Sequence, residues 1–321
     1  MKVDVLTSGY VSMDHIIKIA TPAKVGFTSL VTNKSNSKIF YGGCSVNIAY
    51  ALCRLGMKAM PVLILTLNSQ TVIGMVHCLP LPTTAGFDGD YQRIIDRAVQ
   101  DAVTLEKAGV DAVIVENMGD TPFSAFLNKA QVAALTAAAY AVKQAVQIPV
   151  GLDAAFNDCE ADIAIAAMVG ASFIRVPVFV DTVLFTDGII HPCAKKCMEY
   201  RKMMGQENVK ILADVQVKHA HMLREHITIE QSAKDAASNG ADGIIVTGTQ
   251  VGEETPLDLI KRVKNVVNLP VFAGSGVNAE NIHDQLQTAD GAIIGSSLKE
   301  GGILTNPISY ELVKKVLDGL K

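Results

Sequence analysis

The sequence has no tryptophan and few charged residues, which make up 19% of its 321 positions. It also lacks an excess of basic residues: 28 lysines and arginines stand against 32 aspartates and glutamates, and the net charge is −4. Proteins that bind nucleic acid usually present a basic surface, so this composition argues against a nucleic-acid partner. Hydrophobic residues make up 49% of the chain, enough for a sizeable core, and small-molecule chemistry is the better expectation.

Cysteines are also scarce. Six in a chain of this length are too few for a disulfide-stapled fold and suit a reducing compartment. Asp4 and Asp14 interrupt the region where a secretory leader would need an apolar run. Residues 59–87 contain no Asp, Glu, Lys or Arg, but their three prolines prevent a continuous helix in lipid. We therefore expect a cytoplasmic protein without membrane insertion.

Eight short apolar runs, each followed by a longer amphipathic stretch, recur from residue 72 onward. The runs cover residues 72–76, 112–115, 150–152, 173–174, 210–213, 243–246, 271–273 and 291–294. Strands that alternate with helices form parallel sheets, because parallel neighbours need a crossover connection. Eight such units over roughly 250 residues have the size of a (β/α)₈ barrel. The sequence thus predicts an α/β protein with a TIM barrel.

The intervening helices carry their own signals. Apolar residues recur at helical spacing in the first and the last of them. These residues are Ile94, Ala98, Ala102 and Leu105 in the first, and Leu312, Val313, Val316, Leu317 and Leu320 in the last. Asn306-Pro307 is expected to cap the last helix. Glycine is expected to end four helices in a left-handed cap before a strand. The four steps are Gly109-Val110, Gly170-Ala171, Gly240-Ala241 and Ala289-Asp290-Gly291.

The first 66 residues do not follow this repeat, and we expect a linker at 67–71 before a barrel over 72–321. They predict a strand over 3–9, a polar hairpin or lid over 23–40 and a glycine-opened helix over 42–56. This segment contains Gly9 with Asp14, Gly42-Gly43 with Asn47, and Leu55-Gly56. With these residues it resembles the opening of a PfkB (ribokinase-like) sugar kinase. In that family the aspartate, the paired glycines and the asparagine contact sugar hydroxyls, which implies a sugar-like site at Asp14, Gly42, Gly43 and Asn47.

The kinase family's Gly-Ala-Gly-Asp catalytic turn has no counterpart in this chain. Without a base and an anion hole no phosphoryl group can be transferred, so a complete sugar kinase is not expected. In these kinases the polar hairpin often makes the dimer contact. The resemblance therefore implies a homo-oligomer whose contacts include residues 28–40.

Several motifs stand in order between residue 73 and about residue 317. They are IGMVHCLPLP at 73–82, VENMGDTPF at 115–123, FIRV at 173–176, LADVQVKH at 212–219, VTG at 246–248, GSGV at 274–277 and GSSLK at 295–299. With these motifs the segment resembles the BtpA family (photosystem I biogenesis protein BtpA and SgcQ-like proteins). The family implies the barrel fold, but it leaves the reaction undefined.

Polar residues or glycines follow directly on the eight apolar runs. They are His77, Glu116, Asp153, Arg175, Asp214, Thr247, Gly274 and Gly295. In a parallel barrel these strand ends converge on the face where barrel enzymes keep their active sites. A polar residue at a strand end is often only a cap or a solvated turn. Four charged side chains in one mouth would nevertheless be costly to hold without a ligand, which favours a functional site.

Two glycine-serine loops follow the seventh and eighth runs, where barrels often bind phosphate. They are Gly274-Ser275-Gly276 and Gly295-Ser296-Ser297. Glycine lets backbone N–H groups approach an anion, and serine adds hydroxyl donors. Alternatively, the glycines only permit tight turns. If they bind phosphate, Gly276→Asp should abolish substrate affinity with little loss of stability.

The candidates for acid–base chemistry are Glu116, Asp214 and Lys218, with Asp153, His77 and His219 beside them, and Glu116 and Asp214 are the predicted carriers of proton transfer. Lys218, four residues beyond Asp214, is expected in a loop as an electrostatic clamp. Thr247 and Gly248 could donate to a substrate hydroxyl or phosphate. Arg175 either binds a carboxylate or phosphate of the substrate or neutralises Glu116 or Asp153 in a buried network.

No motif identifies a cofactor: the sequence has no Rossmann, Walker or nucleophile-elbow pattern. His219-x-His221 near Asp214 is compatible with a divalent metal. His191-x-Cys193 with Cys197 lacks the second pair of ligands that zinc needs. Cys193 and Cys197 are instead expected as small apolar residues on one buried helix face.

Two functions follow. The first is an enzyme that applies acid–base chemistry to a phosphosugar or phosphoribosyl compound, as a lyase, isomerase or hydrolase. The second is a non-catalytic assembly factor with a sugar-binding or oligomerising N-terminal segment, as the biogenesis name of the resembled family implies. The predicted polar face with a phosphate site favours the enzyme, since an assembly factor would not need both.

Overall fold

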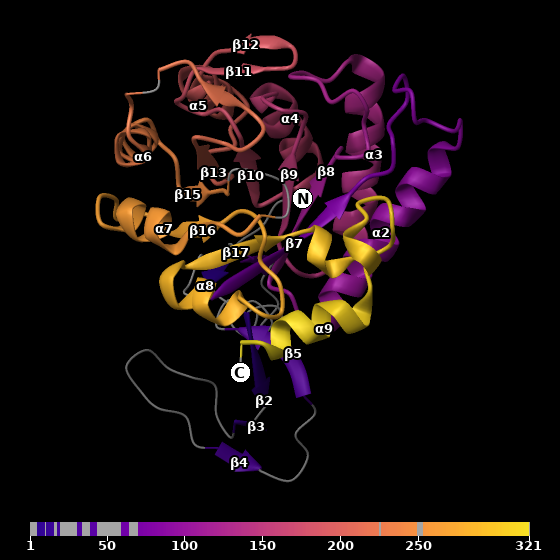
Figure 1. Ribbon diagram of the computed structural model, residues 1–321. Coiled ribbons are helices and arrows are strands. Elements are labelled where there is room, and N and C mark those ends of the chain that lie inside the picture. The colour runs from indigo at the N-terminus through magenta and orange to yellow at the C-terminus, as the bar shows by residue number, and fades with distance from the viewer. Residues whose placement is uncertain are drawn as a thin grey trace. The chain divides into compact units, whose positions relative to one another are not determined.

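The computed structural model describes residues 70–224, 226–248 and 253–320, together with six strand segments between residues 5 and 63 (Figure 1). The chain divides into two compact units, Met1–Thr66 and Leu67–Lys321. In the described residues, no helix combines the length and the apolar character that crossing a bilayer requires.

The unit Met1–Thr66 is described through three pairs of strands. β1 (Val5–Gly9) pairs in parallel with β6 (Ala59–Leu63). β2 (Val11–His15) pairs antiparallel with β5 (Ile39–Gly43), and β3 (Lys18–Ile19) does so with β4 (Val31–Asn33). The strand predicted over 3–9 is confirmed by β1.

The predicted sugar-like site falls partly on these strands. Asp14 lies in β2, opposite Phe40 of β5. Gly42 and Gly43 end β5, so the prediction that they open a helix is wrong. Paired with β2, their backbone belongs to a sheet. The remainder of the predicted helix, including Asn47, lies outside the described residues.

Eight parallel strands of the second unit close into a barrel in the order β10-β13-β15-β16-β17-β7-β8-β9. The strands are β7 (Thr71–His77), β8 (Ala112–Glu116), β9 (Val150–Asp153), β10 (Phe173–Val176), β13 (Lys210–Val215), β15 (Gly243–Val246), β16 (Val271–Ala273) and β17 (Gly291–Ile294). All but Lys210 of their residues are buried, as expected for strands covered on both faces. Each of the eight predicted runs lies within one of these strands, so the predicted TIM barrel is confirmed.

Helices surround the barrel on its outer side (Figure 1). They are α2 (Tyr91–Ala108), α3 (Lys129–Ala145), α4 (Cys159–Val169), α5 (Ala194–Met203), α6 (Ile229–Ser238), α7 (Leu257–Lys264), α8 (Ile282–Thr288) and α9 (Tyr310–Asp318), with two short 3₁₀ turns, η1 (Ser296–Leu298) and η2 (Glu300–Gly302). In α2 the predicted stripe is buried against the strands. In α9 the buried residues are Val313 and Val316, also members of the predicted stripe.

Three of the four predicted glycine caps are confirmed. Gly109, Gly170 and Gly240 have φ angles of 105°, 72° and 97°, in the left-handed region that glycine adopts without strain. The fourth prediction is wrong: α8 ends at Ala289 in an extended conformation, and Gly291 already belongs to β17.

The predicted cap of the last helix is also wrong. Ser309, not Asn306, caps α9, and its side chain accepts a hydrogen bond from the Leu312 N–H. Asn306 belongs to a buried network that fixes the preceding segment on α2. There the Lys299 Nζ donates to the Asn306 carbonyl at 2.8 Å and lies 3.5 Å from the Asp101 carboxylate.

A small antiparallel sheet lies outside the barrel and was not predicted. It contains β11 (Val183–Phe185), β12 (Gly188–Ile190) and β14 (His221–Met222), in the order β12-β11-β14. Its residues Val183 and Ile190 form a separate apolar cluster with Phe156, from the loop after β9, and Val217, from the loop after β13. The sheet therefore gives the loops at this end of the barrel an apolar core of their own.

Candidate active site

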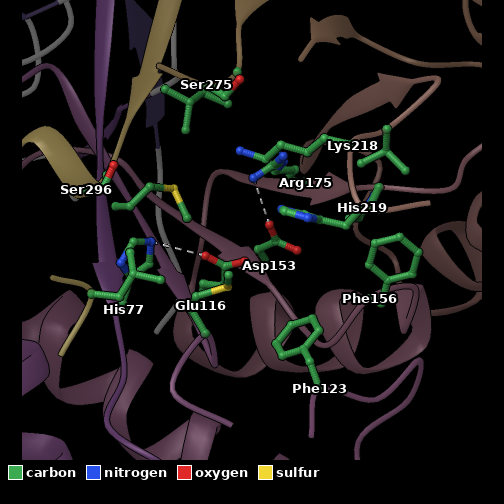
Figure 2. Close-up of a pocket in the computed structure, with 18 of the residues that line it drawn as sticks. His77, Glu116, Phe123, Asp153, Phe156, Arg175, Lys218, His219, Ser275 and Ser296 are labelled. Atoms are coloured by element: carbon green, nitrogen blue, oxygen red, sulfur yellow. Dashed lines mark ion pairs between the residues drawn. The ribbon is translucent and has the colours of Figure 1, made fainter. Parts of the chain in front are cut away.

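A cavity of about 520 Å³ opens at the carboxyl ends of the barrel strands. Figure 2 shows charged and polar side chains from several strands turned into it. Those that line it are His77, Glu116, Asp153, Arg175, Lys218 and His219, together with the loops Gly274–Gly276 and Gly295–Ser297. Most of the side chains predicted from the strand ends thus come together in one wall. Asp214, Thr247 and Gly248 lie outside this wall.

His77 and Glu116 form one pair of this wall. They end the neighbouring strands β7 and β8 directly opposite one another, and His77 Nε2 lies 3.4 Å from Glu116 Oε2. Burial, with the nearby cations Lys299, Arg175 and Lys218, lowers the pKa of His77 to about 3, so the imidazole is neutral. Burial raises the pKa of Glu116, against the opposing effect of Arg175. Glu116 can therefore hold a proton at higher pH than an exposed carboxylate.

Arg175 holds the second group of charges. Its Nε and Nη2 donate to the two carboxylate oxygens of Asp214 at 2.9 and 2.8 Å, and its Nη1 lies 3.4 Å from Asp153 Oδ2. Asp214 therefore positions Arg175 from outside the cavity, whereas Glu116 lines it. Of the two alternatives for Arg175, the buried network is present, with Asp214 and Asp153 as its partners. Arg175 also lines the cavity, so it remains able to contact a ligand.

Two buried polar atoms of this wall have no hydrogen-bond partner, His77 Nδ1 and Asp153 Oδ1. Asp153 is 1% exposed, and burial with the neighbouring Glu116 charge raises its pKa well above the usual value. A buried polar atom without a partner costs about 1–3 kcal/mol, so these atoms mark a place where a ligand can supply hydrogen bonds.

Lys218 and His219 enter the cavity from the loop after β13. Gln216 and His219 adopt left-handed φ angles of 49° and 70°, and the loop is fixed by hydrogen bonds to its backbone. Asp181 accepts from the Gln216 N–H at 2.8 Å, and Thr247 Oγ1 accepts from the Lys218 N–H at 3.0 Å. Thr247 thus positions this loop. Burial and the Arg175 charge lower the pKa of Lys218 to about 8, and burial also lowers the pKa of His219.

The loop after β16 uses its polar groups inside the protein. Ser275 Oγ accepts from the Gly248 N–H at 2.9 Å and donates to the Glu253 carbonyl at 2.9 Å. Gly276 has a φ of 66°, and a Cβ atom there would overlap the backbone of Glu253. The structure therefore contradicts the expectation that Gly276→Asp would spare stability. This glycine is required by the close packing of two loops.

The loop after β17 packs on the charged wall. A Cβ atom on Gly295 would lie 2.9 Å from His77 Cε1, so this glycine leaves room for the imidazole. Ser297 Oγ donates to the Val277 carbonyl at 2.6 Å, whereas Ser296 begins η1 at the cavity. No described residue accepts a hydrogen bond from the backbone N–H groups of Gly276, Val277, Ser296 and Ser297. All four residues line the cavity.

Two features of the site were missed in the sequence. The first is a buried network behind the wall, in which the Asp120 carboxylate accepts from the Leu81 N–H, Asn117 and Gln131, and Asn117 accepts from the Ala155 N–H. It fixes the loops after β7, β8 and β9 to one another. Asn117 and Asp120 belong to the VENMGDTPF stretch. Two polar residues directly after a strand end could have indicated this network.

The second feature is an apolar wall with Phe123, Phe156 and Phe185.

The candidate metal ligands do not assemble. In the part of the chain that the structure describes, no three histidine, cysteine or acidic side chains are arranged to hold a metal ion. His221 is exposed on β14. Cys193 and Cys197 are buried on α5 or at its start, as expected for apolar residues, and Cys159 on α4 lies within hydrogen-bonding reach of both.

Comparisons with known proteins agree with the barrel. The BtpA family model matches residues 68–321. An uncharacterised protein of Pyrococcus furiosus is 42% identical over 252 residues, which are 78% of this chain and 94% of that protein. The photosystem I biogenesis protein BtpA of Synechocystis sp. is 38% identical over 257 residues, 78% of this chain and 89% of that protein. The family match leaves the first 67 residues outside, and these comparisons give the sugar-kinase resemblance no support.

Solved structures share the fold at low sequence identity. (S)-3-O-geranylgeranylglyceryl phosphate synthase from Thermoplasma acidophilum, in complex with sn-glycerol-1-phosphate, has a TM-score of 0.54 and 15% identity. The similarity covers 79% of this chain and 94% of that one. Thiamine phosphate pyrophosphorylase from Pyrococcus furiosus has a TM-score of 0.51 and 13% identity, covering 79% of this chain and 96% of that one.

Proposed function

The chain belongs to the BtpA family, and we propose that its barrel is an enzyme that performs acid–base chemistry on a small phosphorylated metabolite. The observation that carries the proposal is the cavity itself. Buried Glu116 and Asp153 lie in one part of its wall, and loops with available backbone N–H groups lie in another. A buried carboxylate beside cations is suited to proton transfer, and unpaired N–H groups are suited to an anion.

Glu116 is the proposed general acid and base. Burial raises the pKa of Glu116, so this carboxyl group keeps its proton to higher pH than an exposed carboxyl group does. The neighbouring His77 is neutral and carries no positive charge that would oppose this. Arg175 and Lys218 place positive charge where an oxyanion or enolate would develop. The unpaired Nδ1 of His77 and Oδ1 of Asp153 would bind polar groups of the substrate. These roles fit a lyase, isomerase or hydrolase.

The loops after β16 and β17 are the proposed phosphate site. Support comes from the N–H groups of residues 276, 277, 296 and 297 and from the Ser296 side chain at the cavity. Two proteins that share the fold are named for phosphate compounds, and one was solved with sn-glycerol-1-phosphate. Barrels commonly bind phosphate with the loops after their last two strands.

A thermal-shift screen tests the proposal, with each phosphorylated triose, pentose or hexose paired with its unphosphorylated counterpart. A ligand at a hundred times its Kd stabilises the native state by about 2.7 kcal/mol and raises the melting temperature by several degrees. We expect this rise only with phosphorylated members. The proposal fails if no phosphorylated compound raises the melting temperature, or if the unphosphorylated partners do so equally.

The alternative is a non-catalytic assembly factor, for which the name of the Synechocystis relative is the favouring observation. Such a factor needs no buried ionisable cavity. Under this alternative, no phosphorylated compound binds, and the protein co-purifies with a protein complex instead. The screen therefore separates the two functions.

For the unit Met1–Thr66 we propose homo-oligomer contacts through residues 28–40, on the sugar-kinase resemblance alone. Light scattering of the full-length chain tests this, and a monomer would overturn it. We expect no ATP-dependent phosphorylation of any sugar, and measurable activity of that kind would overturn the incomplete-kinase interpretation.

A further inference from the structure

The cavity has an apolar part that the proposed phosphate chemistry does not use. Figure 2 shows Phe123 and Phe156 across the charged row from Ser275 and Ser296. Phe185, Met118 and Pro122 also line the cavity. A phosphosugar has no aromatic ring and could cover these phenyl rings only through its C–H groups, whereas a planar aromatic group can cover a whole ring face.

The aromatic wall is built before any ligand arrives. Phe156 stacks on Phe185 with ring centroids 4.0 Å apart and an angle of 6° between the ring planes. The Phe156 N–H donates to the Ser124 carbonyl at 3.0 Å, which ties the loop after β9 to the loop after β8. Phe185 is held in β11 of the three-stranded sheet. Phe123 and Phe185 pack on this apolar cluster and stay partly exposed.

Partly exposed phenyl rings in a cavity bury most of their remaining surface when a flat ligand group packs against them. Aromatic rings prefer stacked or edge-to-face contacts, and planar heterocycles stack on phenylalanine. The volume of about 520 Å³ lies within the range of about 300–1,000 Å³ of pockets that hold drug-sized ligands. The cavity thus has room for a ring in addition to a phosphorylated linker.

We infer that the substrate is a phosphate monoester whose far end is an aromatic or planar heterocyclic ring, as in a nucleoside 5′-monophosphate. This inference rests on the proposed function for its phosphate end. The ring lies on Phe123 and Phe185, the two partly exposed phenyl rings, and the phosphate lies at the loops after β16 and β17. The hydroxylated linker then passes Glu116 and Asp153, which places the bond between linker and ring near the proposed acid and base.

Calorimetric titration of the full-length protein tests this with three kinds of probe. They are ribose 5-phosphate, the adenine, guanine, cytosine and uracil nucleoside 5′-monophosphates, and the corresponding nucleosides. Stacking of one ring is expected to strengthen binding of at least one monophosphate roughly 5- to 100-fold over ribose 5-phosphate. Equal affinities, or binding of ribose 5-phosphate alone, would overturn the inference and leave the proposed function standing.

The nucleosides test the proposed phosphate site separately from the proposed ring site. If a nucleoside binds as tightly as its monophosphate, the ring site stands and the proposed phosphate site fails. If no probe binds, the inference fails, and the phosphorylated trioses and hexoses of the thermal-shift screen decide the proposed function. The expected order is monophosphate tighter than either the nucleoside or ribose 5-phosphate.

Two matched variants locate the ring. Phe123→Leu removes a partly exposed phenyl ring from the cavity wall, and Phe126→Leu removes one that is 56% exposed in the same loop and outside the wall. Phe123→Leu should weaken the tightest monophosphate about 5-fold or more and leave ribose 5-phosphate unchanged. Phe126→Leu should change neither. Equal effects of the two variants, or equal loss for both probes, would place the ring elsewhere and overturn the assignment.

Discussion

The loops after β16 and β17 and the strand ends of β7 to β10 use their polar groups in opposite ways. In the loops, Ser275 and Ser297 bond to backbone groups of the protein, and Gly276 makes room for a neighbouring loop. At the strand ends, His77 and Asp153 each keep a buried polar atom without a partner.

The difference separates residues that shape the cavity from residues that remain able to react. Unpaired buried groups are costly, so they persist where a ligand compensates for them. In the glycine-serine loops only the Ser296 side chain and backbone N–H groups remain available in the described structure. Reactivity is thus expected from the strand ends, and affinity for an anion from the loops.

Loss of Arg175 should have the largest effect at the strand ends. Arg175→Met leaves the buried carboxylates of Asp214 and Asp153 without their cation. Removing one partner of a buried ion pair costs about 3–5 kcal/mol. We expect this loss in the free energy of unfolding from urea titration. Arg262→Met breaks an exposed pair with Glu230 and should change stability little; similar losses in both variants would contradict the buried network.

Glu116→Gln should affect turnover rather than folding. The amide keeps the shape but cannot carry the proton, and we expect turnover of the substrate found by the screen to fall roughly 10²-fold or more with affinity retained. Glu311→Gln, an exposed change on α9, is the control. Asp214→Asn should lose stability as well as turnover, because Asp214 holds Arg175 through two hydrogen bonds. Unchanged turnover in Glu116→Gln would remove this residue from the mechanism.

The barrel could be predicted because its signal is local and repeated. Each buried strand is a short apolar run, and the carboxyl end of each run meets the others at one mouth whatever the details of packing. That alone placed His77, Glu116, Asp153 and Arg175 together. An ion pair of Arg175 with Asp153 was one of the predicted alternatives, but its pairing with Asp214 was not predicted, since it depends on side-chain lengths across different strands. The Asp214 side chain bonds to Arg175 and does not line the cavity, whereas Glu116 does. The spacing of residues in the sequence does not distinguish the two carboxylates.

The glycine loops show the same limit. Gly276 stands where a phosphate site was expected, but its φ and the nearby Glu253 backbone account for the glycine by themselves. The antiparallel sheet with β11, β12 and β14 was missed because its strands have only two or three residues each. The aromatic wall depends on that sheet, so it was missed with it.

A substitution in the loop after β16 should lower stability. Gly276→Ala places a Cβ atom against the Glu253 backbone at a left-handed φ, and we expect a loss of about 1–3 kcal/mol. Gly170→Ala has a similar φ with open space around it and isolates the conformational part, about 1 kcal/mol. Urea titration of both variants gives the difference. Equal losses would show that the loop packing carries no cost.

At neutral pH the smallest effect expected comes from His77, because its contribution to stability changes only as the pH falls below about 6.5. Its pKa is about 3 in the folded protein and 6.5 when unperturbed, so as pH falls from 6.5 towards 3 the unfolded chain takes up a proton that the folded chain does not. The free energy of unfolding is therefore unaffected above the unfolded pKa and falls at lower pH, by up to about 1.4 kcal/mol per pH unit.

The variant His77→Gln tests this, because it removes this proton uptake, whereas Glu116, whose raised pKa acts in the opposite direction, is present in both proteins. The difference in unfolding free energy between wild type and His77→Gln should therefore change with pH between about 5 and 6.5. His226→Gln, an exposed histidine replaced in the same way, controls for the substitution itself. Parallel stability curves for wild type and His77→Gln would mean that the imidazole takes up its proton equally well in the folded and unfolded states. The strand ends would then not hold His77 as a buried, neutral group that a ligand can bind.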